Sequence, residues 1–534
     1  MNKHDWQSVL ARNWSPNFRQ KPIDLCMLHR AKVYRDTASC SEALLRSRAF
    51  ASALRNIDIH IDQGWLVGNC WGLTSGKLPE GMGEQEYQQL LTVHSLHRQR
   101  DFWAGFDHSL ADYPTLLQIG IAGYRDRIRT AIHRHGALAV QHTLQAFDVT
   151  LNALSAFIIR CATAARQAGN EKQAQLCESV ANRPPEHFAQ ALQLIWLVHL
   201  AFKTEGRCHM ALGRMDQYLL PFYLHDIELG LLTQESALDW LCHMWTRLDE
   251  IGEVQNICIG GLKPDGSDGT NALSYLCLEA TRQVGSPYTN LSARLHDQTP
   301  EAFHRACFDV LRTGIGFPAL FNDHVLIPGL EEIGIPPEVA RDACMVGCIE
   351  TMLAGRQPPW SDSRFNTPLT LLDAMEKLRT TSRPSYPLLI RLFREELAKD
   401  IATHVLMVNN HIAHYPVEKY PDPFLSALTR NCIEQGLDIH NGGAEFPRFH
   451  GIAIMGLATL ADSLAAVKKL VFEKKALSYA DLMDILTRNF EGAEDVRLML
   501  VNSAPKYGND IPYVDHIAAD IVKWTSDVCL EHRL

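Results

Sequence analysis

A thiol and a carboxylate lie two positions apart in the segment Met345-Val346-Gly347-Cys348-Ile349-Glu350 of this 534-residue chain. If the backbone there is extended, side chains two positions apart point the same way, so Cys348 and Glu350 could both reach one small substrate. A reactive thiol beside a carboxylate that moves a proton is a plausible catalytic pair. The triplet alone is a weak signal, because most single cysteines in cytosolic proteins are buried, small apolar side chains.

Neighbouring segments must position this pair. Residues 336–344, before it, are typical of a helix, whereas the loop at residues 355–360, after it, contains two successive prolines and cannot be helical. Residues 291–296 and 318–323 have strand-like patterns, and a long helix is predicted over residues 139–168. Strands separated by helices favour an α/β barrel or sheet.

Composition excludes several classes of protein. The net charge is -10 and the sequence pI is about 6.2, with no long Lys/Arg run, which argues against a nucleic-acid binder. The longest apolar region, residues 191–202, is too short to span a bilayer, so we expect no membrane segment. The 14 cysteines have no repeating spacing and the N-terminus has no signal-peptide stretch, which predicts reduced thiols and a cytoplasmic location. Neither the cysteines nor the 24 histidines have metal-type spacing, so no metal is expected.

Eight segments, taken in chain order, resemble the glycyl radical enzymes, the family of pyruvate formate-lyase and the radical diol dehydratases. The segments are Gly213-Arg214-Met215-Asp216-Gln217-Tyr218, Asn256 with Gly260-Gly261, Asp268-Gly269-Thr270-Asn271-Ala272-Leu273-Ser274-Tyr275, Pro318-Ala319-Leu320-Phe321-Asn322-Asp323, Val346-Gly347-Cys348-Ile349-Glu350, Asn441-Gly442-Gly443-Ala444, Ala461-Asp462-Ser463-Leu464-Ala465-Ala466 and Ala504-Pro505-Lys506-Tyr507-Gly508-Asn509-Asp510. Any one of these segments is a weak match, whereas eight in family order are a specific one.

The resemblance implies a fold. It predicts a ten-stranded α/β barrel made of two five-stranded halves, surrounded by helices and preceded by an N-terminal helical region. Residues 1–180 would form the mainly helical N-terminal part, and residues 181–534 the barrel core. A finger loop inside the barrel would carry Cys348 at its tip, and an interior closed to water would protect a radical.

The resemblance also implies a reaction. In this family the cysteine becomes a thiyl radical that takes a hydrogen atom from a substrate carbon, and Cys348 matches that cysteine. Glu350 would act as general base on the adjacent hydroxyl, and loss of that proton helps the radical carbon to break a neighbouring C–O, C–N or C–S bond. Ile349 stands where pyruvate formate-lyase has a second cysteine, which favours a dehydratase or eliminase over acyl transfer.

The sequence departs from the family after residues 504–510. Family members continue there into a glycyl radical domain with an Arg-Val-x-Gly-Tyr motif, and no such motif occurs in this chain, which ends at Leu534. Three interpretations stay open: a small partner protein supplies the glycyl radical in trans, the chain is a truncated or degenerate fragment, or it is a non-radical relative that binds small molecules or partners. We favour the first, a split radical lyase with its glycyl radical domain absent from this chain, because Cys348 and Glu350 are both present.

We expect this chain to bind no cofactor of its own. The resemblance implies an activating enzyme that uses S-adenosylmethionine and a [4Fe-4S] cluster to install the glycyl radical on the partner. The other expected partners are the small glycyl-radical-domain protein and a small hydroxylated substrate, and family members are often homodimers. The contrasting interpretation is a non-enzymatic binding or regulatory protein built on a degenerate barrel.

Substrate-binding residues carry over less directly. Diol dehydratases have Asn-Gly-His-Ser before their Gly-Arg-x-Asp-Gln-Tyr motif, and this chain has Cys208 and His209 in place of the histidine and the serine. His209 could protonate a leaving group, since the pKa of histidine suits that task, or it could only pack or bond to backbone. His108 belongs to a segment that resembles a pocket-lining segment of the family, and a helix-capping role for that segment is the alternative.

The family's Trp-His-Asp after the cysteine resembles Trp360-Ser361-Asp362. The resemblance implies that Asp362, with Ser361 beside it, hydrogen-bonds substrate hydroxyls, and an exposed loop aspartate is the alternative. Arg356 and Arg364 flank this loop, and either guanidinium could bind an anionic substrate group through two hydrogen bonds. A surface or structural role is the alternative for each arginine.

Overall fold

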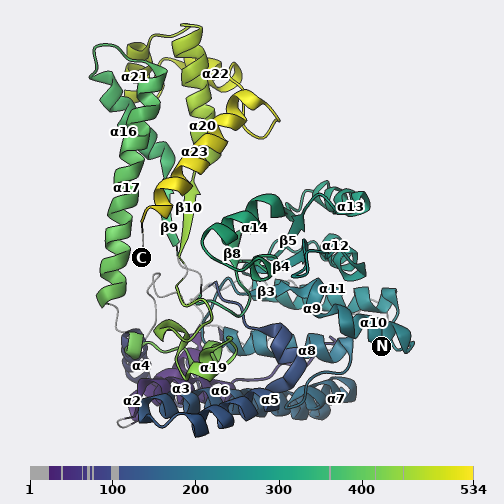
Figure 1. Ribbon diagram of the computed structural model, residues 1–534. Coiled ribbons are helices and arrows are strands. Elements are labelled where there is room, and N and C mark those ends of the chain that lie inside the picture. Colours follow the sequence, from purple (N-terminus) through teal and green to yellow (C-terminus); the bar gives the residue numbers. More distant parts are fainter. Residues whose placement is uncertain are drawn as a thin grey trace. The chain divides into compact units, whose positions relative to one another are not determined.

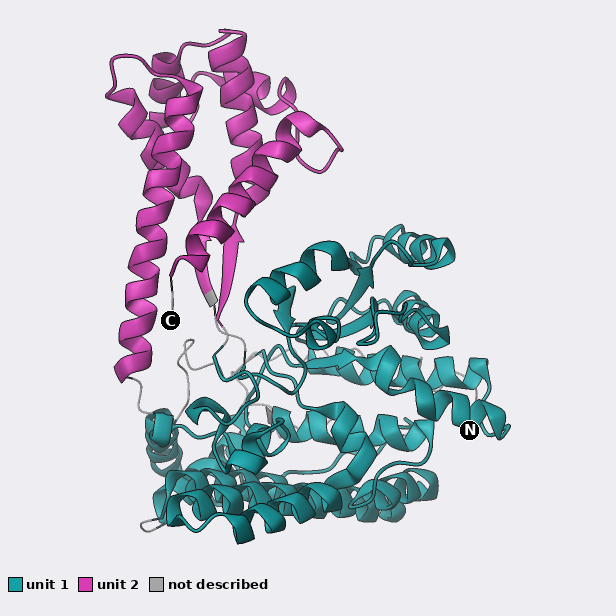
Figure 2. Cartoon of the chain, viewed as in Figure 1, with its two compact units in different colours: residues 1–360, 416–449 teal, residues 361–415, 450–534 magenta. Residues whose placement is uncertain are grey.

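The computed structural model contains two compact units, drawn in teal and magenta in Figure 2. The first unit comprises residues 1–360 and 416–449, and the second comprises residues 361–415 and 450–534. The described residues are 23–37, 40–62, 64–68, 73–74, 77–97, 108–359, 362–414, 417–448 and 450–532. The division of the chain into a mainly helical part, residues 1–180, and a barrel core, residues 181–534, stays a prediction.

The N-terminal half of the first unit is a layer of helices. They are α2 (Leu25–Asp36), α3 (Glu42–Asn56), α4 (Glu84–His97), α5 (Tyr113–Arg134), α6 (Leu138–Gln167), α7 (Glu171–Val180) and α8 (Phe188–Lys203), with the short antiparallel strands β1 (Ile23–Asp24) and β2 (Leu73–Thr74). Helix α3 packs on α2 and α6, and α6 packs on α7. These helices lie together in the purple and blue part of Figure 1. Helix α6 confirms the long helix predicted over residues 139–168.

The first unit also contains a four-stranded parallel sheet with the order β3-β4-β5-β6. The strands are β3 (Ala211–Arg214), β4 (Gln255–Gly260), β5 (Thr289–Leu295) and β6 (Ala319–Asn322). The helices between and after them are α9 (Met215–Tyr218), α10 (Leu220–Glu228), α11 (Gln234–Ile251), α12 (Ala272–Val284), α13 (Glu301–Leu311), α14 (Asp323–Glu332) and α15 (Pro337–Ala340). Strand β4 is buried throughout and β5 almost throughout, as expected for parallel strands covered on both faces. The strands predicted over residues 291–296 and 318–323 are confirmed as β5 and β6.

The segment around Cys348 forms an antiparallel hairpin. Strand β7 (Cys344–Val346) pairs with β8 (Glu350–Met352), and β7 packs against β3 and β4. The helix predicted over residues 336–344 is shorter than predicted, since α15 ends at Ala340 and β7 begins at Cys344. Residues 416–449 complete the unit with η1 (Val417–Lys419), α18 (Pro423–Ala427), α19 (Cys432–Gln435) and η2 (Ile439–Asn441).

The second unit is mainly helical, with two short strands. Strand β9 (Asp362–Asn366) pairs in parallel with β10 (Gly451–Met455). The helices are α16 (Thr367–Arg379), α17 (Tyr386–His414), α20 (Leu457–Ala466), the π-helix η3 (Val467–Glu473), α21 (Tyr479–Thr487), α22 (Glu494–Asn502) and α23 (Pro512–Leu530). Side chains from α16, α17, α20 and α21 form its core, which includes the buried Phe393 and Leu464.

These elements confirm the α/β class but not a closed ten-stranded barrel. Among the described residues, the strands form one four-stranded parallel sheet and three two-stranded pairs. Strands β9 and β10 pair with each other inside the second unit and do not extend the four-stranded sheet. The ten-stranded barrel therefore stays a prediction.

Helix α6 has the length and composition of a membrane-crossing helix, and no other helix in the described ranges does. However, 56% of its apolar window is buried inside the protein, and α6 packs on α3 and α7. A buried helix in a protein core meets the same two criteria, so this helix is weak evidence for a membrane segment.

The buried helix α8 generates a prediction about acid stability. Burial and the nearby Lys203 cation lower the pKa of His199 from 6.5 to about 3. The unfolded chain therefore binds a proton at His199 that the folded chain does not, and stability is lost as the pH falls from about 6.5 toward about 3. We expect His199→Asn, which cannot take up a proton, to reduce this loss by about 1.4 kcal/mol per pH unit across that window.

Urea denaturation curves between about pH 7 and about pH 4 would measure the effect. The exposed His516 supplies the matched control, since His516→Asn should leave the pH dependence of the parent unchanged. An unchanged slope in His199→Asn would contradict the assignment of acid sensitivity to this buried imidazole.

Candidate active site

The predicted pair lies in a tight turn rather than in extended backbone. Residues 347–349 connect β7 to β8, and Val346 pairs with Glu350 at the base of this turn. The Glu350 carboxylate folds back over the turn, and its Oε2 accepts the backbone N–H groups of Cys348 at 2.7 Å and Ile349 at 2.9 Å. The predicted extended backbone is therefore wrong at residues 347–349. Cys348 and Glu350 are neighbours because the carboxylate bonds the N–H groups of the turn.

Gly347 is required in this turn for two reasons. Its φ of 57° lies in the left-handed region, which favours glycine. A Cβ at this position would lie 2.2 Å from Cδ2 of His108 and 2.9 Å from Oε2 of Glu350. The His108 ring and the Glu350 carboxylate therefore both lie against the backbone just before Cys348.

The two predicted histidines stack on each other beside this turn. The rings of His108 and His209 have centroids 4.8 Å apart and planes inclined by 12°. Both residues have a φ of 53°, and their segments are joined by hydrogen bonds from His108 N–H to the Cys208 carbonyl, 3.2 Å, and from Ala211 N–H to the Ser109 carbonyl, 3.1 Å. Nδ1 of His209 is buried and has no hydrogen-bond partner among the described residues. The sequence named these two histidines separately, and the structure brings them together.

A buried arginine joins the two histidine-bearing segments. Arg207 is fully buried, and its Nη1 donates to the hydroxyl of Ser109 at 3.0 Å. Its Nη2 donates to the buried carboxylate of Asp422, and its Nε donates to Glu205 at 3.1 Å. Burial alone would raise the pKa of Asp422, but the charges of Arg207 and His440 hold that pKa well below its usual range. Arg207 thus links Ser109, which follows His108, to the segment that carries His209 two positions further on.

Two asparagines hold the tip of the hairpin against the parallel sheet. Asn256 on β4 and Asn290 on β5 each direct Nδ2 to the Gly347 carbonyl at 3.4 Å, and Asn256 also reaches the Cys348 carbonyl at 3.3 Å. Both side chains are buried. Asn256 entered the sequence argument only as part of a motif, and Asn290 was missed. Amide side chains within strands expected to be buried are the signal that could have identified them.

Two buried guanidinium groups hold the base of the same hairpin. Arg214 donates to the carbonyls of Arg341 at 2.9 Å and Gly260 at 2.8 Å. Arg294 donates to the carbonyls of Arg341 at 2.8 Å and Ala343 at 2.6 Å, and its Nε pairs with Asp323 at 2.7 Å. These contacts fix the backbone immediately before β7.

Residues from the family-like segments also bond to one another below the hairpin. Oδ2 of Asp216 accepts the N–H of Gly260 at 2.8 Å and the hydroxyl of Ser274 at 2.6 Å. Gln217 donates its amide to the Gly269 carbonyl at 2.7 Å. Burial raises the pKa of Asp216. Three segments that the resemblance linked only by order are therefore joined by hydrogen bonds.

The tip of the hairpin is accessible. Cys348 is exposed and Ile349 is 65% exposed, so the first unit by itself does not enclose the thiol. The sequence argument expected this tip inside a closed barrel, and that enclosure is not provided by the four-stranded sheet.

Other predicted residues do not join this cluster within the first unit. Asp362 and Arg364 belong to β9 of the second unit, where Arg364 is exposed, and Ser361 lies outside the described residues. Arg356 forms an ion pair with Glu445 at 2.7 Å, which supports the structural alternative for that arginine. The substrate-binding roles of Asp362, Ser361 and Arg364 thus stay predictions.

Known proteins resemble this chain along most of its length. The family model described as "Pyruvate formate lyase-like" matches residues 80–534. The chain is 33% identical over 497 residues to the probable dehydratase YbiW of Escherichia coli (strain K12), which covers 82% of this chain and 61% of that protein. It is 30% identical over 421 residues to the trans-4-hydroxy-L-proline dehydratase of Clostridioides difficile, which covers 71% of this chain and 53% of that protein. The chain thus spans between 53% and 61% of the length of these two curated relatives.

A solved structure supports the same fold. The glycerol-bound form of the B12-independent glycerol dehydratase from Clostridium butyricum superimposes with a TM-score of 0.81 and 24% sequence identity. The match covers 98% of this chain and 79% of that chain. At this identity the likeness establishes the fold alone.

The Arg207–Asp422 pair generates a stability prediction. Asp422→Asn leaves the fully buried guanidinium without its closest negative charge, so we expect the free energy of unfolding to fall by about 3 kcal/mol at neutral pH. Because the pKa of Asp422 is depressed in the folded protein, its contribution is present above about pH 4 and is lost as the pH falls further. Urea denaturation of parent and variant at several pH values would measure both effects.

The exposed pair of Lys523 and Asp527 provides the control. Asp527→Asn should change stability by less than about 1 kcal/mol, since exposed ion pairs contribute little. Equal effects of the two substitutions would refute the structural importance of the buried pair.

Proposed function

Since the chain belongs to the pyruvate formate lyase-like family of glycyl radical enzymes, we propose that it is the thiyl-bearing catalytic subunit of a radical lyase. The proposed reaction is elimination or dehydration of a small hydroxylated substrate. The names of the relatives support this class, because two of them are dehydratases that match over more than two thirds of this chain. Substrate and leaving group are not fixed by this resemblance.

The observation that carries the proposal is the gathering of four side chains at one turn. Cys348 stands on the turn, the Glu350 carboxylate bonds its backbone N–H, and the stacked His108 and His209 lie alongside. These are a hydrogen-abstracting thiol, a carboxylate that can accept a proton, and two imidazoles that can donate or accept one. A structural turn has no need of all four groups together.

In the proposed step, the thiyl sulfur of Cys348 takes a hydrogen atom from the substrate carbon that bears a hydroxyl. An S–H bond forms, a C–H bond breaks, and the unpaired electron moves to carbon. Glu350 takes the hydroxyl proton, and the resulting electron-rich radical expels the group on the neighbouring carbon by cleavage of a C–O, C–N or C–S bond. Return of the hydrogen atom from Cys348 to the product radical restores the thiyl.

The geometry of Glu350 suits a base beside this thiol. Both turn N–H groups donate to its Oε2, and Oε1 accepts no hydrogen bond from the described residues. One oxygen thus fixes the orientation of the carboxylate while the other is available to a substrate hydroxyl. We propose that His108 and His209 orient the substrate, and that His209 can protonate the leaving group.

The remaining site and fold assignments belong to the same proposal. The family resemblance supports a ten-stranded barrel of two five-stranded halves, with Asp362, Ser361 and Arg364 as further substrate-binding residues. We also propose a cytoplasmic location and a possible homodimer. None of these assignments is needed for the roles of Cys348 and Glu350.

The proposal also includes the source of the radical. We propose that a small glycyl-radical-domain protein supplies the radical in trans, to the thiol of Cys348 exposed at the tip of the hairpin. An activating enzyme that uses S-adenosylmethionine and a [4Fe-4S] cluster would install that radical on the partner. This chain would then bind the partner and the substrate but no cofactor.

Anaerobic turnover assays of this chain with a glycyl-radical-domain protein and its activator test the chemistry. A panel of small hydroxylated compounds, including hydroxyproline and glycerol, supplies the substrates. We expect Cys348→Ser to abolish turnover and Glu350→Gln to slow it by about 10² to 10⁴. Cys40→Ser changes a partly buried cysteine elsewhere in the first unit and should retain parental turnover.

Turnover by Cys348→Ser at the parental rate would remove the thiyl role, whereas lack of turnover by the parent would favour a non-radical binding protein. Turnover with the activator alone, without the partner protein, would leave the roles of Cys348 and Glu350 intact but contradict radical supply in trans. Electron paramagnetic resonance identifies which polypeptide carries the glycyl radical in each case.

A further inference from the structure

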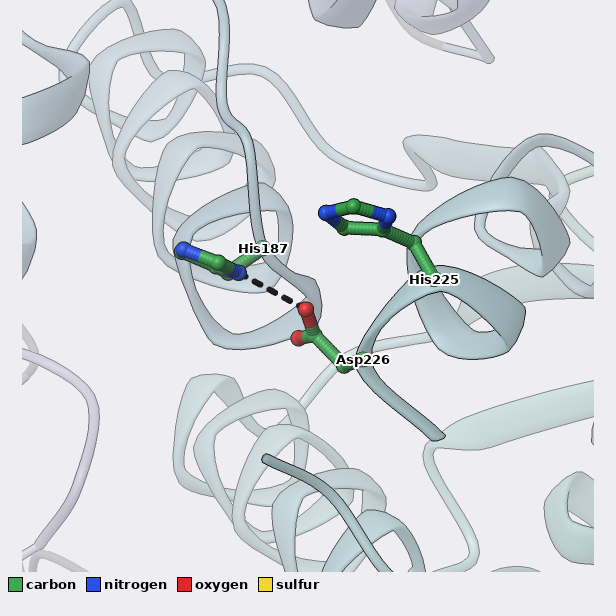
Figure 3. Close-up of side chains that lie close together, drawn as sticks. All are labelled: His187, His225 and Asp226. Carbon is green, nitrogen blue, oxygen red and sulfur yellow. Dashed lines mark hydrogen bonds and ion pairs between the residues drawn. The ribbon is translucent and has the colours of Figure 1, made fainter. Parts of the chain in front are cut away.

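Two imidazoles and one carboxylate converge at the start of helix α8, outside the candidate active site. His187 immediately precedes α8, and His225 and Asp226 are adjacent on α10. One possible ligand atom from each of the three side chains lies within 4.8 Å of the other two. Figure 3 shows the three side chains facing one another, with the His187–Asp226 hydrogen bond drawn as a dashed line.

The carboxylate of this cluster is buried, and its two oxygens have separate roles. Asp226 is 4% exposed, its Oδ1 is hydrogen-bonded to Nδ1 of His187 at 2.7 Å, and its Oδ2 accepts the N–H of Phe188 at 2.8 Å. Among the described residues, His187 is the sole basic side chain within ion-pair distance of Asp226. A divalent cation would add a fixed positive charge beside this buried carboxylate.

We propose that His187, His225 and Asp226 bind a zinc-type divalent transition-metal ion. Imidazole nitrogen and carboxylate oxygen are common zinc ligands, and three protein ligands with a water in the fourth position form a familiar tetrahedral site. Sequence patterns did not indicate this site, because 39 positions separate His187 from Asp226 and the three residues form no short metal motif.

The geometry requires only a small adjustment. Zinc–ligand bonds of about 2.1 Å place the ligand atoms of a tetrahedral site about 3.4 Å apart. The widest separation in the cluster is 4.8 Å, and His225 is exposed, so rotation of its side chain can close the gap. Asp226 can turn Oδ1 to the metal while Oδ2 keeps the Phe188 N–H, and such outer contacts orient metal ligands.

The bound ion would join the N-terminus of α8 to α10. Helices α8 and α10 already pack on each other, and almost every residue of α8 is buried. A ligand that binds only the folded state stabilises it in proportion to the logarithm of ligand concentration over Kd. We therefore expect a structural effect on the first unit, independent of the proposed lyase reaction.

Isothermal titration of the full-length, chelator-treated chain with zinc chloride tests the site, and cobalt(II) chloride provides a second probe. We expect one tight equivalent, visible cobalt absorption of tetrahedral type, and a rise in Tm on addition of zinc. His225→Ala should weaken zinc binding at least about tenfold and abolish the rise in Tm. Among the described residues, the hydrogen bonds of Asp226 go to His187 and Phe188 and not to His225, so the metal-free Tm of this variant should equal that of the parent.

Further variants separate a metal site from a helix cap. His187→Ala should also weaken zinc binding, whereas His516→Ala, at an exposed histidine of the second unit, should not. Asp226→Asn should lower both zinc affinity and the metal-free Tm, because it weakens the contact with Phe188. Protons compete with zinc for imidazole, so affinity should fall from about pH 7.5 to about pH 5.5. Absence of zinc binding by the parent, or equal binding by His225→Ala and the parent, would overturn the proposal.

Discussion

Two buried positive charges fix the loop that carries the candidate thiol. Arg214 and Arg294 come from β3 and β5, and both donate to the carbonyl of Arg341 just before the hairpin. A guanidinium removed from water is stable only where acceptors meet its N–H groups. The arginines therefore dictate where the backbone enters β7, and the parallel sheet dictates where the arginines lie. These hydrogen bonds consequently tie the base of the hairpin to the sheet.

The tip of the hairpin is held by contacts of two kinds. Long amide hydrogen bonds of 3.3 to 3.4 Å from Asn256 and Asn290 reach the carbonyls of the tip. Gly347 lets the His108 ring and the Glu350 carboxylate approach the backbone closely. The Glu350 carboxylate adds shorter hydrogen bonds, because its Oε2 accepts the N–H groups of Cys348 at 2.7 Å and Ile349 at 2.9 Å. The backbone that carries the candidate thiol is therefore held at the tip as well as at the base.

The neighbouring placement of Cys348 and Glu350 was predictable from the sequence, whereas its geometric cause was not, and the catalytic roles of the two residues stay predictions. The proximity of Cys348 and Glu350 follows from their spacing in either conformation, so the pair was identified although the extended backbone was wrong. His108 and His209 are separated by about a hundred residues, and only the family resemblance drew attention to each of them. Asn290 belongs to none of the recognised motifs. Its contact with the hairpin tip depends on the pairing of β4 with β5, which no local sequence pattern encodes. Closure of a barrel likewise depends on long-range strand pairing.

The Arg207–Asp422 pair has a consequence for biosynthesis, because 215 positions separate the two residues. At translation rates of about 5 to 20 residues per second, the ribosome needs roughly 10 to 40 seconds to make the chain between them. During that interval Arg207 has the Glu205 carboxylate made just before it, but not Asp422, its closest partner. The newly made first unit therefore cannot complete this buried ion pair until residues 416–449 have been made.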